Sequence, residues 1–116
     1  MPVEFLGIAG TNPASEVTAR RGGILDLDYT RRLARAHEDH GWDRILFAYH
    51  SGSPDPAQVA AYVAGHTDRL TLVVAHRPNV SAPTYAAKTL ATLDHLSGGR
   101  AEVHFITGGS TADQAA

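Results

Sequence analysis

Leu96-Ser97-Gly98-Gly99-Arg100 ends an apolar helical stretch and leads into a predicted strand from Ala101 to Ile106. Thr107-Gly108-Gly109 stands at the point where that strand stops. A glycine pair after a strand lets backbone N–H groups approach a bound molecule closely, which suits a flat or phosphate-bearing ligand. This segment therefore predicts, in order, the end of a helix, a strand and a site lined by backbone.

Three more apolar runs of strand length precede this segment. They are Val3–Ala9, Arg44–Tyr49 and Leu70–Ala75. The second contains the continuous apolar run Ile45-Leu46-Phe47, and the third is apolar almost throughout. Continuous apolar runs of this length are typical of parallel strands that are buried on both faces.

Apolar residues at helical spacing predict a helix in each segment between two strands. The first helix is expected to begin at the N-cap Asp28 and to run through His40, with Gly41 at its end. The second is expected to begin at Asp55-Pro56, and the third to cover Pro83–Leu96. The residues expected to face inward are Tyr29, Leu33, Ala36 and His40 in the first helix, Val59, Tyr62, Val63 and His66 in the second, and Ala86, Ala87, Leu90, Leu93 and Leu96 in the third.

Regular alternation of strands and helices predicts an α/β fold with a parallel sheet. Two architectures fit this order: a small doubly wound sheet, and the first half of a TIM-type (β/α)8 barrel, which needs about 250 residues. The fourth predicted strand is followed only by a Gly- and Ala-rich tail and by no covering helix. We therefore expect residues 1–116 to be the N-terminal part, about four βα units, of a single barrel domain, with the remainder missing or separate.

Composition restricts the kinds of partner and chemistry that are expected. The formal net charge is −2, which gives no reason to expect a nucleic-acid partner. The chain has no cysteine, so disulfides, thiolate catalysis and cysteine metal sites are excluded. The sequence shows neither an apolar run of membrane-spanning length nor a basic leader, so no membrane partner and a cytoplasmic location are expected.

Polar residues follow each predicted strand, and in parallel α/β folds ligands bind beyond these carboxyl ends. His50 could bind a cofactor or act as an acid or base near neutral pH, or simply be a loop histidine. Arg77 is a candidate anion partner or a member of a structural salt bridge. His104 lies within the fourth strand, and its side chain is expected on the same face of the strand as that of Ile106. If this face lines a barrel interior, His104 points into a site. We call the segments at the carboxyl ends of the four predicted strands the strand exits; they are Gly10-Thr11-Asn12, Tyr49-His50-Ser51, His76-Arg77-Pro78 and Thr107-Gly108-Gly109.

Motifs of several other enzyme classes are absent from the sequence. It contains no His-x-His or His-Glu-x-x-His pattern, so no metal site is expected, although His50, His76 and His104 keep a metal-dependent barrel hydrolase open as an alternative. It also contains no Gly-x-Ser-x-Gly and, after the first strand, no Gly-x-Gly-x-x-Gly. A serine nucleophile and a dinucleotide fingerprint are therefore not predicted.

The chain resembles the luciferase-like flavin monooxygenase family, and within it the alkanesulfonate monooxygenase branch. The more specific part of the resemblance is Leu96-Ser97-Gly98-Gly99-Arg100 followed by Ile106-Thr107-Gly108-Gly109. Supporting pieces are Pro83, Ala86-Ala87-Lys88, Ala91-Thr92-Leu93-Asp94, Ala34-Arg35-Ala36-His37-Glu38 before Gly41-Trp42-Asp43-Arg44, and Thr67-Asp68-Arg69-Leu70 before Val74-Ala75-His76-Arg77-Pro78.

The resemblance implies a βα barrel that uses reduced FMN as a substrate-like cofactor and molecular oxygen as co-substrate. It also implies a separate flavin reductase, a homo-oligomer and a small organic substrate, with carbon–sulfur cleavage common in this branch. Sulfonate-type members carry a cysteine in the loop after the second strand, where this chain has Ser51-Gly52-Ser53-Pro54. By position, the residues implied in flavin binding are Gly10, Thr11, His50, His76, His104, Thr107 and Gly108; no catalytic residue is assigned, and the segment alone is not expected to be active.

Two further alternatives remain at this point. A deazaflavin-dependent dehydrogenase or reductase would use the same barrel and a similar site, with hydride transfer in place of oxygen chemistry. A small α/β binding or regulatory module would be complete at this length and would fold cooperatively as a monomer.

Overall fold

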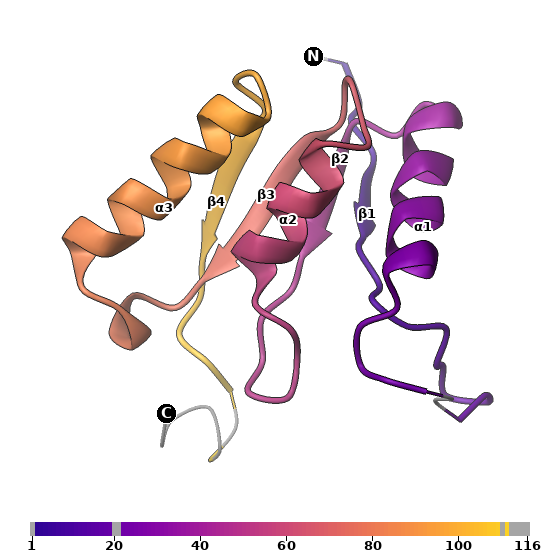
Figure 1. The fold of residues 1–116 in the computed structure, drawn as a ribbon, viewed down its shortest axis with the longest axis horizontal. Helices are drawn as coiled ribbons and strands as arrows, with labels where there is room; N and C mark the ends of the chain where they lie inside the picture. Colours follow the sequence, from indigo (N-terminus) through magenta and orange to yellow (C-terminus); the bar gives the residue numbers. More distant parts are fainter. Residues whose placement is uncertain (1, 20–21, 110, 112–116) are drawn as a thin grey trace.

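The computed structural model describes residues 2–19, 22–109 and 111, and its strands form one parallel sheet in the order β1-β2-β3-β4. Helices alternate with the strands, as Figure 1 shows. A short 3₁₀ helix, η1, lies between β3 and α3. The elements are β1 (Leu6–Ile8), α1 (Leu27–Asp39), β2 (Arg44–Phe47), α2 (Pro56–Ala64), β3 (Thr71–His76), η1 (Pro78–Val80), α3 (Pro83–Leu96) and β4 (Ala101–Phe105).

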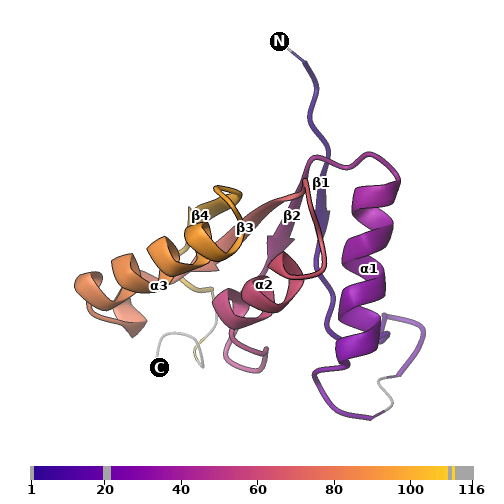
Figure 2. The same ribbon diagram turned by 45° about the horizontal axis from the view of Figure 1, so that its top comes forward.

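The three α-helices lie on one face of the sheet in both ribbon views (Figures 1 and 2). A doubly wound sheet carries helices on both of its faces. The arrangement seen here is that of one wall of a βα barrel, in which the helices form the outer layer. Of the two architectures that the sequence left open, the described residues therefore form the barrel type.

The hydrophobic core lies between the sheet and the helices. Ile45 pairs with Leu72, and Phe47 with Val74, so these four side chains share the face covered by the helices. All four are at most 2% exposed. The α2 side chain of Val63 joins the same cluster. Complete burial of each such aliphatic or aromatic side chain contributes about 1.5–3 kcal/mol to folding.

Among the described residues, no helix covers the opposite face of the sheet, and we call it the open face (Figure 2). Strand register places Ile8, Leu46, Val73 and Ala75 on it, which makes its middle apolar. Near the strand starts it is charged, because Arg44 forms ion pairs with a glutamate on either side. The partners are Glu4, at 2.8 Å from the Arg44 Nε, and Glu102.

The turn between α3 and β4 is anchored by Arg100. Its guanidinium donates five hydrogen bonds, to Oγ1 of Thr67 and to backbone oxygens of Ala64, Thr67, Leu70 and Ser97. The two preceding residues, Gly98 and Gly99, both have positive φ, so the Ser-Gly-Gly-Arg motif builds a tight turn. This turn ties α2, β3 and β4 together at the amino edge of the sheet.

Glu38, near the end of α1, supports the same edge. Its carboxylate accepts hydrogen bonds from the backbone N–H groups of Asp68, Arg69 and Leu70, which lead into β3. Partial burial acts to raise the pKa of Glu38, but these three donors and the nearby Arg100 outweigh it and leave the pKa lowered.

Several boundaries and facings differ from the prediction. Strand β1 begins at Leu6 in place of Val3. Helix α1 is capped by Asp26, not Asp28, because Asp26 accepts from the Tyr29 N–H and its own N–H is held by the Thr11 carbonyl. Helix α3 has the predicted limits.

The side chains that face the core also differ in part from the prediction. In α1 the buried residues are Thr30 and Ala34, whereas Ala36 and His40, which were expected to face inward, are exposed. In α3, Ala87 and Leu96 were expected to face inward and are exposed.

Candidate functional site

The candidate site lies at the carboxyl edge of the sheet, where all four parallel strands end (Figure 1). The long loop after β1, the loop after β2, η1 after β3 and the segment after β4 leave the sheet at this edge. This is the edge at which βα barrels place their binding loops. The amino edge, by contrast, is occupied by the hydrogen bonds of Glu38 and Arg100 described above.

At the exit of β1, Thr11 fixes the long loop. Its Oγ1 donates to the Ile24 carbonyl at 2.8 Å, and its own carbonyl accepts the Asp26 N–H at 2.7 Å. Gly10 lies against α1, since a β-carbon there would be 3.3 Å from the side chains of Tyr29 and Leu33. The loop is therefore closed at its base by Thr11, directly beside the candidate site.

At the exit of β2, His50 has a defined ring geometry. Its Nδ1 accepts the backbone N–H of Gly52 at 3.2 Å, so the neutral ring carries its proton on Nε2. The His50 carbonyl accepts the Ser53 hydroxyl, and Ser53 Oγ accepts the His50 N–H. The side chain is exposed and presents a donor, Nε2–H, to a ligand at this edge.

The structure brings Gly10, Thr11 and His50 together. These three residues line one pocket of about 240 Å³ between the exits of β1 and β2. Phe47 and Val59 supply apolar surface in it. The segments that follow β1 and β2 therefore lie side by side at this edge.

On β4, His104 pairs with Ala75 and lies on the open face. Strand alternation alone places His104 opposite Val103 and Phe105 and leaves open which face of the sheet that is. Thr107 is exposed just beyond the strand, where the backbone N–H of Ile106 still pairs with the His76 carbonyl at 2.9 Å. His104 thus lies near the carboxyl end of the open face, and Thr107 follows the strand at the same edge of the sheet.

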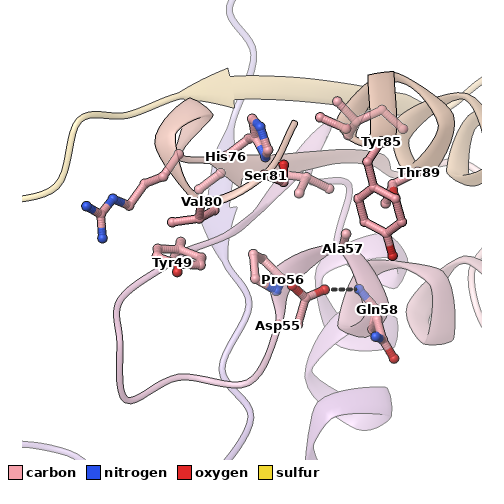
Figure 3. Close-up of a pocket in the computed structure, with 15 residues that line it drawn as sticks. Tyr49, Asp55, Pro56, Ala57, Gln58, His76, Val80, Ser81, Tyr85 and Thr89 are labelled. Carbon is pink, nitrogen blue, oxygen red and sulfur yellow. Dashed lines mark hydrogen bonds between the residues drawn. The ribbon is translucent and has the colours of Figure 1, made fainter. Parts of the chain in front are cut away.

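His76 lies on the other side of the sheet. Its register partner Phe105 shares the helix-covered face, and the two rings meet edge to face at 6.1 Å between centroids. Together with Tyr49, Asp55 and Tyr85 it lines a separate pocket of about 450 Å³ between α2, α3 and η1. Figure 3 shows this pocket, with Tyr49 and Tyr85 at its two sides. The structure therefore does not bring His76 together with His104.

Gly108 lies against Arg77, and its backbone has a φ of +82°. A β-carbon at this position would lie 3.0 Å from Cζ and Nε of Arg77. The Arg77 side chain is 1% exposed and its Cζ stands 5.8 Å from the centre of the Tyr49 ring. Sequence reasoning proposed Arg77 as an anion partner or salt-bridge member and gave no sign of this packing, since only the fold brings the three strand exits together.

Within residues 2–19, 22–109 and 111, no three histidine, aspartate or glutamate side chains group in a way that could hold a metal ion. The opposite facings of His76 and His104 explain why these two do not converge. The same part of the chain contains no helix with the length and apolar character needed to cross a membrane.

The residues at this edge fit a planar, partly polar group such as a flavin ring. The open face is apolar at Ile8, Leu46 and Ala75, and the segments after β2 and β4 bring the hydrogen-bond donors of His50 and Thr107 to the same carboxyl edge. A flat ring with polar edges needs this combination, because its face is apolar while its nitrogens and oxygens require partners.

Comparison with known proteins identifies a family and similar folds. Residues 4–116 match the family model described as luciferase-like monooxygenase. EDTA monooxygenase from Chelativorans sp. BNC1 superposes with a TM-score of 0.84 at 21% identity, over 97% of this chain and 30% of that one. The coenzyme F420-dependent tetrahydromethanopterin reductase from Methanopyrus kandleri gives 0.80 at 21% identity, over 99% and 30%.

A riboflavin lyase, solved with modified FMN and its substrate riboflavin, has a TM-score of 0.73 at 28% identity, over 97% of this chain and 31% of that one. The chain thus spans about 30% of the length of these solved structures. Its four parallel strands and alternating helices match the N-terminal part of a luciferase-like barrel, which confirms the predicted fold class.

Proposed function

This chain belongs to the luciferase-like monooxygenase family, and from that premise we propose that residues 1–116 are the N-terminal part of one flavin-binding βα barrel. The proposed barrel is completed by further polypeptide that covers the open face and pairs with β1 and β4. The exposed apolar side chains of Leu6 and Ile8 on one outer strand, and of Val103 and Phe105 on the other, support this proposal.

The proposed reaction is the oxygenation of a small organic substrate by an FMN-dependent monooxygenase. Reduced FMN, supplied by a separate reductase, would provide the electrons that activate molecular oxygen. Monooxygenases among the similar folds, such as EDTA monooxygenase, support this choice. Organosulfur compounds, as in the alkanesulfonate branch, are the first substrate class to test, and we expect a homo-oligomer.

The observation that carries the proposal is that the candidate residues gather at the carboxyl edge: His50 lines a pocket with Gly10 and Thr11, His104 lies on the open face of β4, and Thr107 follows that strand. In the assembled site, His50 would donate from Nε2 to the flavin, with Gly10 and Thr11 beside it. His104 and Thr107 would bind the ring from the β4 side, and the backbone at Gly108 would approach it closely. The apolar part of the open face would orient the ring and exclude water. His76 is the least supported of the predicted flavin residues, because it faces the helices.

Flavin binding is the direct test. The complete protein is titrated with oxidised FMN, and quenching of flavin fluorescence is expected with a Kd in or below the micromolar range. His50→Ala and His104→Ala are expected to weaken this binding, whereas His95→Ala, on the far end of α3, serves as a matched control. A complete protein that leaves FMN fluorescence unchanged at high micromolar concentration would refute the proposal.

A second candidate is a deazaflavin-dependent reductase on the same barrel. The superposition on the coenzyme F420-dependent reductase, with a TM-score of 0.80, favours testing it. The two candidates separate on cofactor preference and on oxygen use. A monooxygenase binds FMN more tightly than the deazaflavin and consumes oxygen in a substrate-dependent way, while the reductase transfers hydride and consumes none.

A further inference from the structure

We infer that Arg77 is a positioning residue, which holds the exits of β2 and β4 against each other and so sets the spacing of the flavin site. The inference deepens the proposed function and depends on it for the identity of the ligand. Arg77 itself does not reach the proposed site from solvent, because its side chain is only 1% exposed. It acts through the residues that it contacts.

The first contact is with the exit of β2. The Arg77 guanidinium carbon lies 5.8 Å from the centre of the Tyr49 ring, within the range of a cation–π interaction. Tyr49 directly precedes His50, one of the residues proposed to bind the flavin. A shift of the Tyr49 ring would therefore move the backbone that carries His50.

The second contact is with the exit of β4. The guanidinium lies so close to Gly108 that a β-carbon there would be 3.0 Å from its Cζ and Nε and 3.2 Å from its Nη2. Gly108 directly follows Thr107, the proposed flavin contact on this side. The planar guanidinium thus lies against the backbone that positions Thr107, and the absence of a side chain at 108 allows this approach.

A guanidinium suits this place better than an ammonium. It is flat, so one side can face the Tyr49 ring while the group also lies along the Gly108 backbone. Lysine keeps the charge but has no flat surface, and methionine keeps much of the apolar stem without charge. These two substitutions therefore separate the effect of shape from that of charge.

The experiment measures flavin binding and loop order in Arg77→Lys and Arg77→Met. We expect Arg77→Met to raise the Kd for FMN about tenfold or more and Arg77→Lys to raise it less, whereas the exposed control Arg32→Met stays within about twofold. The visible circular dichroism of bound FMN is expected to change in Arg77→Met at saturating flavin. Backbone amide hydrogen exchange at residues 50–53 and 107–109 is expected to be faster in Arg77→Met than in wild type. This measurement is made on the protein without flavin.

A double-variant cycle tests the contact with Gly108. Gly108→Ala should weaken FMN binding, while Gly41→Ala, with the same φ of +82° but no atom within 4 Å of its β-carbon, should not. If Arg77 acts through this contact, combining Arg77→Met with Gly108→Ala weakens binding by about as much as one change alone, and not by the product of the two.

The outcomes are distinct. Unchanged FMN affinity and unchanged dichroism in Arg77→Met, with wild-type protein that binds FMN, overturns the inference and leaves the proposed function intact. A wild-type protein that does not bind FMN overturns the proposed function. Amide exchange at residues 50–53 and 107–109 then still decides whether Arg77 holds these two segments together. Unchanged exchange in both Arg77 variants refutes this positioning role.

Discussion

Nη1 of Arg100 donates a hydrogen bond to Oγ1 of Thr67 at 3.0 Å, joining the start of β4 to the segment that follows α2. The same guanidinium uses its other donors on backbone oxygens, so all of its hydrogen-bonding capacity is directed inward. The most specific motif of the sequence, Ser-Gly-Gly-Arg, therefore stabilises the fold at the amino edge and lies at the opposite end of the strands from the proposed flavin site.

Replacement of Arg100 is expected to reduce stability strongly. Arg100→Ala leaves several partly buried carbonyls without a donor, at a cost of about 3 kcal/mol. Arg100→Lys should recover only part of this, because an ammonium cannot reproduce the planar set of donors. The denaturation midpoint of the full chain measures the effect, and Arg31→Ala, at an exposed ion pair, is the control with a change below about 0.5 kcal/mol.

Loss of the charge at Glu38 is expected to destabilise the fold and to change its response to acid. The folded-state pKa of Glu38 is lowered, so the carboxylate stabilises the protein fully above its ordinary value of 4.5 and loses this effect as the pH falls through the folded pKa. Glu38→Gln should cost about 1–3 kcal/mol at pH 7 and nearly nothing well below pH 4.

Urea unfolding of wild type and Glu38→Gln at several pH values measures this difference. Asp39→Asn is the control, because Asp39 is exposed and only 3.9 Å from Arg35 in a surface pair. A difference between wild type and Glu38→Gln that stays constant from pH 7 to pH 3 would contradict the proposed role of the charge.

A methyl group at Gly7 is expected to disturb the packing of α1 on β1. Its β-carbon would overlap Nε2 of His37, so this ring must leave its contacts with the Leu33 carbonyl and Trp42, or the helix or the strand must move. Overpacking of this kind costs about 1–3 kcal/mol. Gly23→Ala, in the long loop, is the control, because the nearest atom to a β-carbon there would be 3.9 Å away. Equal thermal midpoints for the two variants would contradict the expected loss of stability at Gly7.

The two histidines at the ends of β3 and β4 are expected to differ in their effect on flavin. His104→Ala should raise the Kd for FMN about tenfold, since His104 lies on the open face, while His76→Ala should stay within about twofold. Fluorescence titration of the complete protein compares them directly. Equal losses from both variants would mean that the flavin contacts both faces of the sheet, and the proposed site would then be wrong.

Much of the fold could be predicted because its signals are local. The apolar runs of β2 and β3 and the Asp55-Pro56 start of α2 identify these elements directly. The choice between Asp26 and Asp28 as helix cap could not be made locally, since both are good caps and the bond from Thr11 to Asp26 joins residues far apart in sequence. The inward face of α1 was misplaced together with its cap.

The site could be predicted only in part. Alternation along β4 places His104 on the face opposite Val103 and Phe105, because the side chains of a strand point alternately to its two sides. Parity within β3 alone could not say which face His76 would share, since that depends on the register with β2 and β4. The bridge from Arg77 to Tyr49 and Gly108 joins three strand exits and follows from no single stretch of sequence.

The ion pairs of Arg44 with Glu4 and Glu102 make the two ends of the open face different: the end at the strand starts is charged, and the part beyond it is apolar. An uncharged planar guest would have to displace a strongly hydrated triad to settle near the strand starts, and it meets hydrocarbon only farther along. The two carboxylates and the guanidinium thus disfavour an apolar ring at the strand starts. We expect small molecules to enter and leave at the carboxyl edge, between the loops that follow the strands.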